Sequence, residues 1–472
     1  MCQRMTWERL LSPKRFRDSD GHETSRGTES HDKKNGRTAY QKDIDRIVFS
    51  RSFRRLGRKT QVHLLAKDDH IHTRLSHSLE VSCVGRSLGV MIGHWLRDER
   101  GERPPQKDFE WPSTLGEIVQ AACLAHDIGN PPFGHAAEDA IRRWFQERSD
   151  DEARWKDQLK PGEIGDLRCF DGNAVAFRVI VHKEFYGEQG GMRLTYATLG
   201  ALLKYPWTSH FAKLGKPKFS RFKTEYDSLC EIAGQLGLPE KTRAEGEHKA
   251  EYARHPLAYL VEAADDICYH VLDIEDAIEL KLLPENTLYE GFSRLLEGDL
   301  SEEQRHLLRE PSISWHTKNG LLRGKMMGRM TEEIAHVFTD HYDTIMEGRF
   351  ERDLLSRSDG DSVCLAIEGL YEREKLAKKI YQNQRNIPLE LGVYSLLRTL
   401  LEASWEAACE LVRGGKLSYK TEIIKRFVKY DRGDQLSDKS LYRVIMLFLD
   451  YITGMTDEYA TFVNRQLLGL GN

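Results

Sequence analysis

The sequence predicts an all-α protein with at most a small β-hairpin, on three observations. From Asp45 onward, apolar residues recur three and four positions apart, which is the spacing of one helix face. Only residues 60–65 and a few short pieces are rich in the residue types that strands favour. Polar, turn-rich stretches separate the periodic segments, and the chain has no internal repeat or low-complexity tract. We therefore expect one broad helical core.

Three of the expected helices carry polar side chains on their apolar stripes. The first begins near position 76, and His77 opens its stripe. The second begins near position 114, and its stripe continues to His126. The third begins near position 255, and its stripe includes Asp265, whereas Asp266 falls on the polar side. Helical periodicity thus selects Asp265 as the inward carboxylate.

The stretches between the periodic segments are expected to be irregular. Residues 12–43 are polar and charged with few aliphatic side chains, which is typical of a flexible or partner-dependent segment. The turn-rich stretches 99–112 and 148–165 and the charged stretch 234–250 are expected to be loops.

Composition indicates an ordinary globular protein with a highly charged surface. The 472 residues include 40% hydrophobic and 31% charged side chains, and the net charge of −4 provides no global basic field for nucleic acid. The eight cysteines are scattered without a C-x-x-C pair, which excludes a zinc knuckle and indicates a reducing compartment. The N-terminus lacks the apolar core of a signal peptide, and no run of eighteen apolar residues exists. We expect a cytoplasmic protein.

Four side chains from the three helices form a candidate metal site: His77, His126, Asp127 and Asp265. A single inward His is more often a hydrogen-bonded core residue than a ligand, whereas an unpaired buried carboxylate is costly. A metal ion would neutralise the carboxylates and satisfy both imidazoles together. Two His and two Asp suit Mn²⁺, Mg²⁺, Fe²⁺ or Zn²⁺, and this ligand set does not choose between them.

A second His–Glu pair follows the candidate ligands in H-D-I-G-N-P-P-F-G-H-A-A-E (126–138). His135 and Glu138 are three residues apart after the Pro-Pro break, so they share one face of the next helix. Without the adjoining His-Asp doublet, this pair would be a routine surface contact. Beside a metal, it indicates a proton-transfer group of a hydrolase.

The longer strings around these residues resemble the HD-domain metal-dependent phosphohydrolases, and within them the deoxyguanosinetriphosphate (dNTP) triphosphohydrolase family. The resemblance runs in the family's order from about residue 37 to about residue 460. The matching strings are D-R-I-V-F-S-R-S-F-R-R-L-G-R-K-T-Q-V (45–62), H-T-R-L-S-H-S-L-E-V (72–81), the string 126–138, F-D-G-N-A (170–174), L-T-Y-A-T-L-G-A-L-L-K-Y-P-W (194–207), E-A-A-D-D-I-C-Y-H-V-L-D-I-E-D (262–276) and D-Y-I-T-G-M-T-D (450–457).

The resemblance implies a domain plan and a set of roles. Residues 1–36 would be a flexible polar segment, 37–300 an HD-domain helical bundle, and 301–472 a C-terminal helical region packed on it. The metal ligands would be the four named above, with His135 and Glu138 as the catalytic pair. In the branch of the animal HD-domain dNTPase another His stands where this chain has Asn130, which concentrates acid–base work on His135.

The resemblance also implies a nucleotide pocket. The residues matching phosphate contacts are Arg74, Asn173, Lys204, Tyr205 and Lys218; in the last case the cationic run leaves Lys213, Lys216 and Lys223 as alternatives. Tyr269 and Asp273 follow Asp265 on nearly the same face, where they would contact the deoxyribose, and Gln61 would lie near the sugar and base. Glu390 and Arg443 are further base-pocket candidates.

The implied reaction is hydrolysis of a deoxynucleoside 5′-triphosphate, such as dGTP, to deoxynucleoside and inorganic tripolyphosphate. Two alternatives remain open: an HD-type nucleotidase or guanosine tetra/pentaphosphate hydrolase, and a nucleic-acid-binding sensor with a vestigial site. Relatives form symmetric oligomers, so a homo-oligomer is expected. Some relatives bind single-stranded DNA as an effector, which the net charge does not support here.

Overall fold

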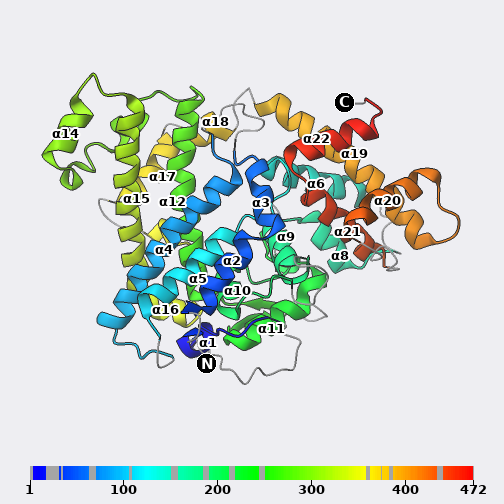
Figure 1. Ribbon diagram of the computed structural model, residues 1–472, viewed down its shortest axis with the longest axis horizontal. Coiled ribbons are helices and arrows are strands. Elements are labelled where there is room, and N and C mark those ends of the chain that lie inside the picture. Colours follow the sequence, from blue (N-terminus) through cyan, green and yellow to red (C-terminus); the bar gives the residue numbers. More distant parts are fainter. Residues whose placement is uncertain are drawn as a thin grey trace.

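Helices make up most of the structure, a computed structural model, and the predicted all-α class is confirmed (Figure 1). The residues that it describes are 4–16, 31–32, 36–62, 71–105, 109–149, 158–183, 191–211, 218–243, 250–357, 362–373, 375–381, 386–432 and 440–470.

Two small antiparallel hairpins are the regular β-structure of the described residues. Strand β1 (His31–Asp32) pairs with β2 (Arg37–Thr38), and β3 (Glu240–Arg243) pairs with β4 (Ala250–Tyr252). The expectation of a loop over 234–250 was therefore partly wrong. Of the expected strand at 60–65, Thr60 forms an isolated bridge with Thr73, and residues 63–65 lie outside the described part.

The first hydrophobic core is centred on α4 (Arg74–Asp98), α5 (Trp111–Ala125) and α12 (Pro256–Glu279), the three helices expected from periodicity. Helices α4 and α5 pack closely because α4 presents glycine where the backbone of α5 passes. A Cβ at Gly89 would lie 2.7 Å from the carbonyl oxygen of Leu115, and one at Gly93 would lie 2.5 Å from Pro112. This close packing brings the start of α4 beside the end of α5.

Other helices complete the first core around this centre. They are α1 (Trp7–Leu10), α2 (Ala39–Val48), α3 (Arg51–Arg55), α10 (Tyr196–Leu202), α11 (Tyr226–Leu236), α13 (Thr287–Phe292), α14 (Glu302–Arg309), α15 (Trp315–Asp340), α16 (Tyr342–Met346), α17 (Val363–Arg373) and α18 (Leu376–Tyr381).

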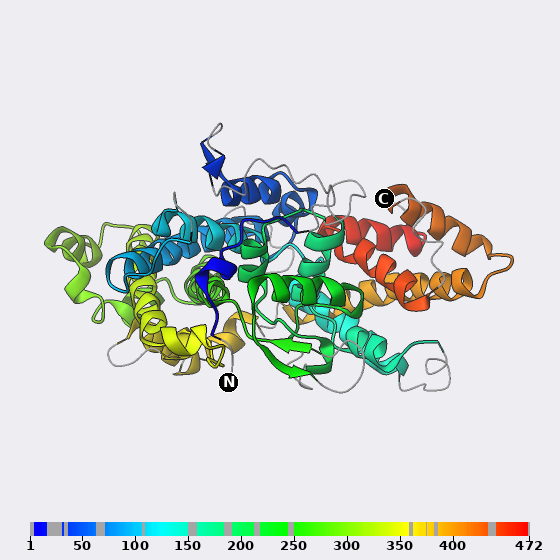
Figure 2. The same cartoon turned by 90° about the horizontal axis from the view of Figure 1, so that it is seen from below.

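A second hydrophobic core lies toward the opposite end of the elongated molecule (Figure 2). Its helices are α6 (Gly134–Ser149), α8 (Pro161–Arg168), α19 (Asn386–Arg413), α20 (Tyr419–Arg432), α21 (Leu441–Thr453) and α22 (Asp457–Leu467). Short α9 (Gly172–Arg178) contributes Val175 to this core and Phe177 to the first. The region 301–472 is therefore divided: α15 packs on α4 and α12, whereas α19 packs on α6.

The expectation of a flexible N-terminal segment does not hold for residues 4–16. Trp7, Leu10 and Phe16 are buried in the first core, because the apolar residues of this stretch are few but lie on its inward side. Polar residues further on are also fixed. The buried carboxylate of Asp43 accepts hydrogen bonds from Arg15 and from the backbone and side chain of Thr195.

In the described part of the chain, no helix is both long and apolar enough to cross a membrane. Among the described residues, Cys83, Cys123, Cys169, Cys230 and Cys268 are free thiols.

Candidate active site

His126 is oriented by the end of its own helix. It follows the last residue of α5, and its Nδ1 lies 2.7 Å from the carbonyl oxygen of Cys123. Because a carbonyl only accepts, Nδ1 carries the proton, and the lone pair of Nε2 is left facing the cluster. Nε2 is buried and has no hydrogen-bond partner. A buried imidazole nitrogen without a partner, with its other nitrogen held by a carbonyl, is the arrangement of a metal ligand.

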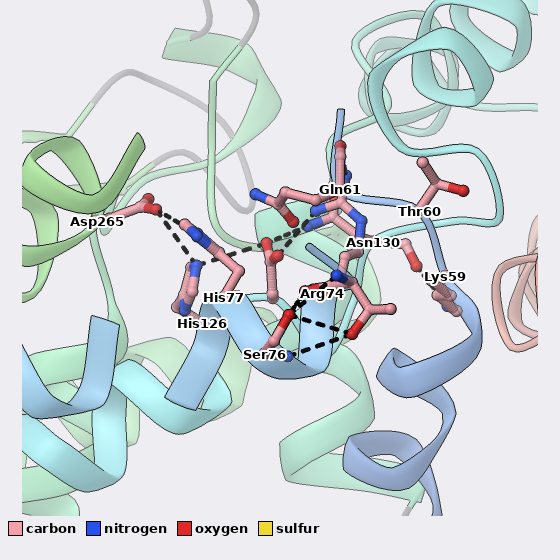
Figure 3. A network of polar contacts seen from close by, with 12 residues as sticks. Lys59, Thr60, Gln61, Arg74, Ser76, His77, His126, Asn130 and Asp265 are labelled. Carbon is pink, nitrogen blue, oxygen red and sulfur yellow. Dashed lines mark hydrogen bonds and ion pairs between the residues drawn. The ribbon is translucent and has the colours of Figure 1, made fainter. Parts of the chain in front are cut away.

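The structure brings His77, His126 and Asp265 together from three distant parts of the chain (Figure 3), and Asp127 directly follows His126. Ligand atoms of His77, His126 and Asp127 lie within 4.8 Å of one another. Oδ1 of Asp265 lies 3.1 Å from Nε2 of His77 and 3.4 Å from Nε2 of His126. Asp127 Oδ1 is 3.6 Å from the same nitrogen of His126. This buried His/Asp cluster fits a divalent cation in donor type, because imidazole nitrogen and carboxylate oxygen suit such ions.

Both ligand carboxylates are held in their charged form. Burial disfavours the charge on Asp127, but the Arg74 guanidinium outweighs it and holds its pKa at about 2. Burial acts in the same sense on Asp265, where the ammonium of Lys204 holds the pKa well below its usual value. The cluster therefore offers two anionic oxygen ligands at neutral pH.

Two cations and an amide surround the carboxylates. Nη1 of Arg74 donates to Oδ2 of Asp127 at 2.8 Å, and Nζ of Lys204 donates to Asp265 at 2.5 Å. The side chain of Asn130 also donates to Asp127. Arg74 and Lys204 are both buried, so their charges act in a medium that screens them weakly. They place positive charge beside the cluster, where phosphate oxygens would need it.

His135 and Glu138 lie on the first turns of α6, as their spacing predicted, but no hydrogen bond joins them among the described residues. Glu138 accepts instead from the backbone N–H of Gly172 at 2.7 Å, and Nη2 of Arg142 lies 3.6 Å from it. His135 is exposed at the start of the helix. The three-residue spacing does not by itself bring the pair together, because Glu138 is buried and has these other partners.

Of the other residues expected at the phosphates, Asn173 contacts Asp171, and Lys218 lies near Tyr205. The side chain of Asn173 donates to Asp171 at 2.8 Å. Tyr205 is buried and follows Lys204 directly, and Nζ of Lys218 lies 5.5 Å from the centre of its ring. The alternative Lys223 donates to Glu163 at 2.8 Å, and Lys213 and Lys216 lie outside the described residues.

The residues expected at the sugar lie further along α12. The ring of Tyr269 stacks on Tyr381 of α18, with 5.6 Å between centroids and 11° between planes. Tyr381 also donates its hydroxyl to Asp273 at 2.5 Å. Burial raises the pKa of Asp273 to about 8, so this carboxyl is largely protonated at neutral pH.

The remaining expected residues are less closely tied to the cluster. The backbone oxygen of Gln61 accepts from Arg74 at 3.4 Å, and its buried side-chain oxygen has no hydrogen-bond partner (Figure 3). Glu390 and Arg443 are exposed on α19 and α21.

Sequence reasoning missed several side chains beside the site. Tyr381 lies on a short helix without a recognisable motif, so no signal marked it. Asp171 stands in the matched string 170–174, beside Asn173, and burial together with the charge of Glu138 raises its pKa to about 7. His72 stands in the string 72–81 and joins the start of α4 to α12 through Asp276, with Nδ1 and Oδ1 2.6 Å apart.

The helical fold and the His/Asp cluster define an HD-domain protein: the HD domain family model matches residues 74–186. This range covers His77, His126 and Asp127 and the helices that carry them.

Relatives that align with most of this chain show which family of HD-domain proteins it belongs to. The chain is 43% identical over 426 residues to a deoxyguanosinetriphosphate triphosphohydrolase-like protein of Pseudomonas aeruginosa, covering 89% of this chain and 91% of the relative. A Synechocystis protein described in the same words is 35% identical, with 99% and 100% covered. The deoxyguanosinetriphosphate triphosphohydrolase of Yersinia pseudotuberculosis is 30% identical, with 89% and 91% covered. The chain therefore belongs to the deoxyguanosinetriphosphate triphosphohydrolase-like family of phosphohydrolase enzymes.

Proposed function

We propose that this enzyme hydrolyses deoxynucleoside 5′-triphosphates, dGTP among them, to deoxynucleoside and inorganic tripolyphosphate. The observation that carries the proposal is the buried cluster of His77, His126 and Asp127, which Asp265 approaches to 3.1 Å at His77, with Arg74 and Lys204 against the two carboxylates. The names of the relatives, which describe deoxyguanosinetriphosphate triphosphohydrolases, support a triphosphate substrate.

The proposed ligands of a divalent cation are His77, His126, Asp127 and Asp265. A cation bound there would polarise phosphate and lower the pKa of water, with Mn²⁺ or Mg²⁺ proposed and Fe²⁺ or Zn²⁺ as alternatives. Arg74 and Lys204 would exchange part of their contact with the carboxylates for phosphate oxygens. They would then stabilise the negative charge that grows on those oxygens during the reaction.

In the proposed reaction, a water oxygen bonds to the α-phosphorus as the bond from that phosphorus to the 5′-oxygen breaks. The water oxygen ends in tripolyphosphate, and the sugar leaves as its 5′-alcohol. That alcohol needs a proton, which we assign to His135 as donor. The attacking water gives up one proton to solvent, and solvent returns a proton to His135 after the sugar leaves. The exposed position of His135 leaves its imidazole free to meet a bound substrate, and the buried Glu138, one helical turn further on, accepts from the backbone N–H of Gly172.

The pocket for the nucleoside is proposed along α12. Tyr269 would lie against the deoxyribose, where its ring would leave no room for a 2′-hydroxyl. Asp273 would bond to the 3′-hydroxyl in place of Tyr381. Asn173, Tyr205 and Lys218 are proposed at the phosphates, and Gln61 near the sugar and base.

Incubation with dGTP and Mn²⁺ in ¹⁸O-labelled water tests the reaction. We expect deoxyguanosine and tripolyphosphate, with the label in tripolyphosphate. Release of pyrophosphate or orthophosphate, as a nucleotidase or a guanosine tetra/pentaphosphate hydrolase would give, contradicts the proposal. A panel of the four dNTPs, singly and mixed, then establishes substrate preference.

Replacing His135 by Ala tests the proton donor. Turnover should fall by about 100-fold or more, because general acid catalysis typically contributes that much. Binding of Mn²⁺, measured by calorimetry, should stay unchanged since His135 is not a proposed ligand. A fully active variant would show that another group protonates the leaving oxygen.

We also propose a homo-oligomer, in line with the symmetric assembly common among soluble enzymes. Light scattering at several concentrations tests it. Single-stranded DNA as an effector is the weaker proposal, because the net charge of −4 gives it no support.

A further inference from the structure

Apart from Gln61, two of the matched strings have no role in the proposed chemistry, and the structure brings both to one turn of the active site. Residues 45–62 and 450–457 lie nearly four hundred positions apart along the chain. Lys59 and Thr60 from the first string and Asp457 from the second meet at the turn 130–134, which connects the His-Asp doublet to α6. Figure 3 shows Lys59, Thr60 and Asn130 of this region.

Asp457 uses both carboxylate oxygens on this contact. Its Oδ1 accepts from the backbone N–H of Phe133 at 2.9 Å. Its Oδ2 accepts from the backbone N–H of Thr60 at 2.9 Å and from the Thr60 hydroxyl at 2.6 Å. The residue is only 4% exposed, so water does not compete for these bonds. Asp457 is the first residue of α22, yet its carboxylate binds outside that helix.

Lys59 binds the same turn at its first residue, Asn130. Its Nζ donates to the backbone oxygen of Asn130 at 2.5 Å and to that of Thr453 at 2.8 Å. It is 3% exposed. Lys59 thus joins the start of the turn to the end of α21, while Asp457 joins the end of the turn to the start of α22.

The turn has a backbone shape that needs such support. Phe133 has φ of 64°, in the left-handed region that a bulky side chain avoids, and Gly134 follows with φ of 56°. At Gly134 a side chain would collide with the guanidinium of Arg74, which lies against the backbone there. A strained backbone persists only where its surroundings impose it, and functional sites are where such strain gathers. His135 comes directly after this turn.

We propose that Asp457, assisted by Lys59, is a positioning residue for the hydrolysis. It holds the turn 130–134 in its strained shape and thereby sets the position of His135 relative to the metal cluster. The C-terminal helices α21 and α22 are then part of the active site's support. This inference rests on the proposed function, because it takes His135 as the proton donor.

The test compares Asp457→Asn with Glu458→Gln. An amide keeps the size of the carboxylate but offers one accepting oxygen, so it cannot serve both Phe133 and Thr60. Glu458→Gln is the matched control: it removes the same charge from the same end of α22, and Glu458 is exposed with its nearest cation, Arg58, at 3.5 Å.

We expect Asp457→Asn to lower kcat by about 10- to 100-fold, since small displacements of a reacting group have effects of that size. KM and Mn²⁺ binding should stay near those of the unmodified enzyme, because Asp457 and Lys59 do not contact the proposed metal ligands. Hydrogen exchange at residues 130–135 should become faster. Glu458→Gln should match the unmodified enzyme in each measurement.

Two results would overturn the proposal. One is a folded Asp457→Asn variant with the kcat and exchange of the control. The other is a loss of kcat accompanied by an equal loss of Mn²⁺ binding, which would make Asp457 a support of the metal cluster. Should Asp457→Asn not fold, Thr60→Val decides, because it removes only the hydroxyl donor. If a folded Thr60→Val enzyme keeps its kcat and its rate of hydrogen exchange at residues 130–135, the proposed role of Asp457 is contradicted.

Failure of the proposed reaction can be distinguished from failure of the positioning role of Asp457. If the unmodified protein hydrolyses no deoxynucleoside triphosphate, the reaction is wrong, while hydrogen exchange still reports whether Asp457 holds the turn.

Discussion

Asp265 and Asp266 show at the residue scale how a single position along a helix decides a role. Asp265 lies against both imidazoles and Lys204, which keep it charged. The pKa of Asp266 is raised well above its usual value by burial and by the neighbouring charges of Glu262 and Asp265. Neighbours in sequence, they differ because the helix turns each toward a different environment.

Replacing each of these carboxylates by an amide gives a matched pair of variants. Asp265→Asn should weaken Mn²⁺ binding by about 100-fold or more and abolish turnover, since it removes an anionic ligand; even outer-shell changes typically cost 10- to 100-fold. Asp266→Asn should bind Mn²⁺ like the unmodified protein. Calorimetric titration with Mn²⁺ checks both, and equal loss in the two variants would remove Asp265 from the ligand set.

At the scale of elements, the site depends on how closely α4 and α5 approach. His77 lies in the first turn of α4 and His126 follows the end of α5, so their separation is set by the packing of these helices. Glycines on α4 permit that packing, because Gly89 and Gly93 face the backbone of α5.

Gly89→Ala should therefore destabilise the protein. Its Cβ would meet the carbonyl of Leu115, so the helices must separate, which typically costs about 1–3 kcal/mol. Mn²⁺ binding should weaken in parallel. Gly320→Ala on α15 is the control: nothing lies within 4 Å of its Cβ, and alanine should stabilise the helix by up to about 1 kcal/mol. Urea denaturation of both variants measures the change, and a stabilised Gly89→Ala would refute the packing argument.

At the scale of the whole molecule, a buried ionic group joins the two hydrophobic cores. Arg178, the last residue of α9, donates from Nε to Asp450 of α21 at 2.8 Å and from Nη2 to the same carboxylate at 3.0 Å. Its Nη1 donates to Glu225, which is fully buried before α11. α9 itself packs into both cores, so these contacts lie where the two halves meet.

Replacing Arg178 by Met should reduce the free energy of unfolding by about 3–5 kcal/mol, because it leaves buried carboxylates without their cation. Unfolding should also become less cooperative, as the cores lose a shared contact. Arg398→Met is the control, since Arg398 and Glu402 form an exposed pair on one helix. Differential scanning calorimetry distinguishes them, and similar unfolding curves would show that Arg178 does not couple the cores.

The sequence predicted the ligand helices well and their surroundings poorly, for one physical reason. Helical periodicity is local, so it located α4, α5 and α12 to within a few residues and selected Asp265. Contacts between residues far apart in sequence produce no repeating pattern along the chain. Three findings depend on elements remote in sequence: the hydrogen bond from Tyr381 to Asp273, the burial of segment 4–16, and the contact of Glu138 with Gly172 in place of His135.

By itself, the sequence determined the all-α class, the family and the residue types of a candidate metal site, because each is written in periodicity or in contiguous strings. Only the tertiary structure decided that Arg74 and Lys204 lie on the ligand carboxylates, that the C-terminal region divides between two cores, and that Asp457 reaches the turn before His135. Those arrangements follow from the packing of whole helices, which fixes distances between side chains that no spacing along the chain encodes.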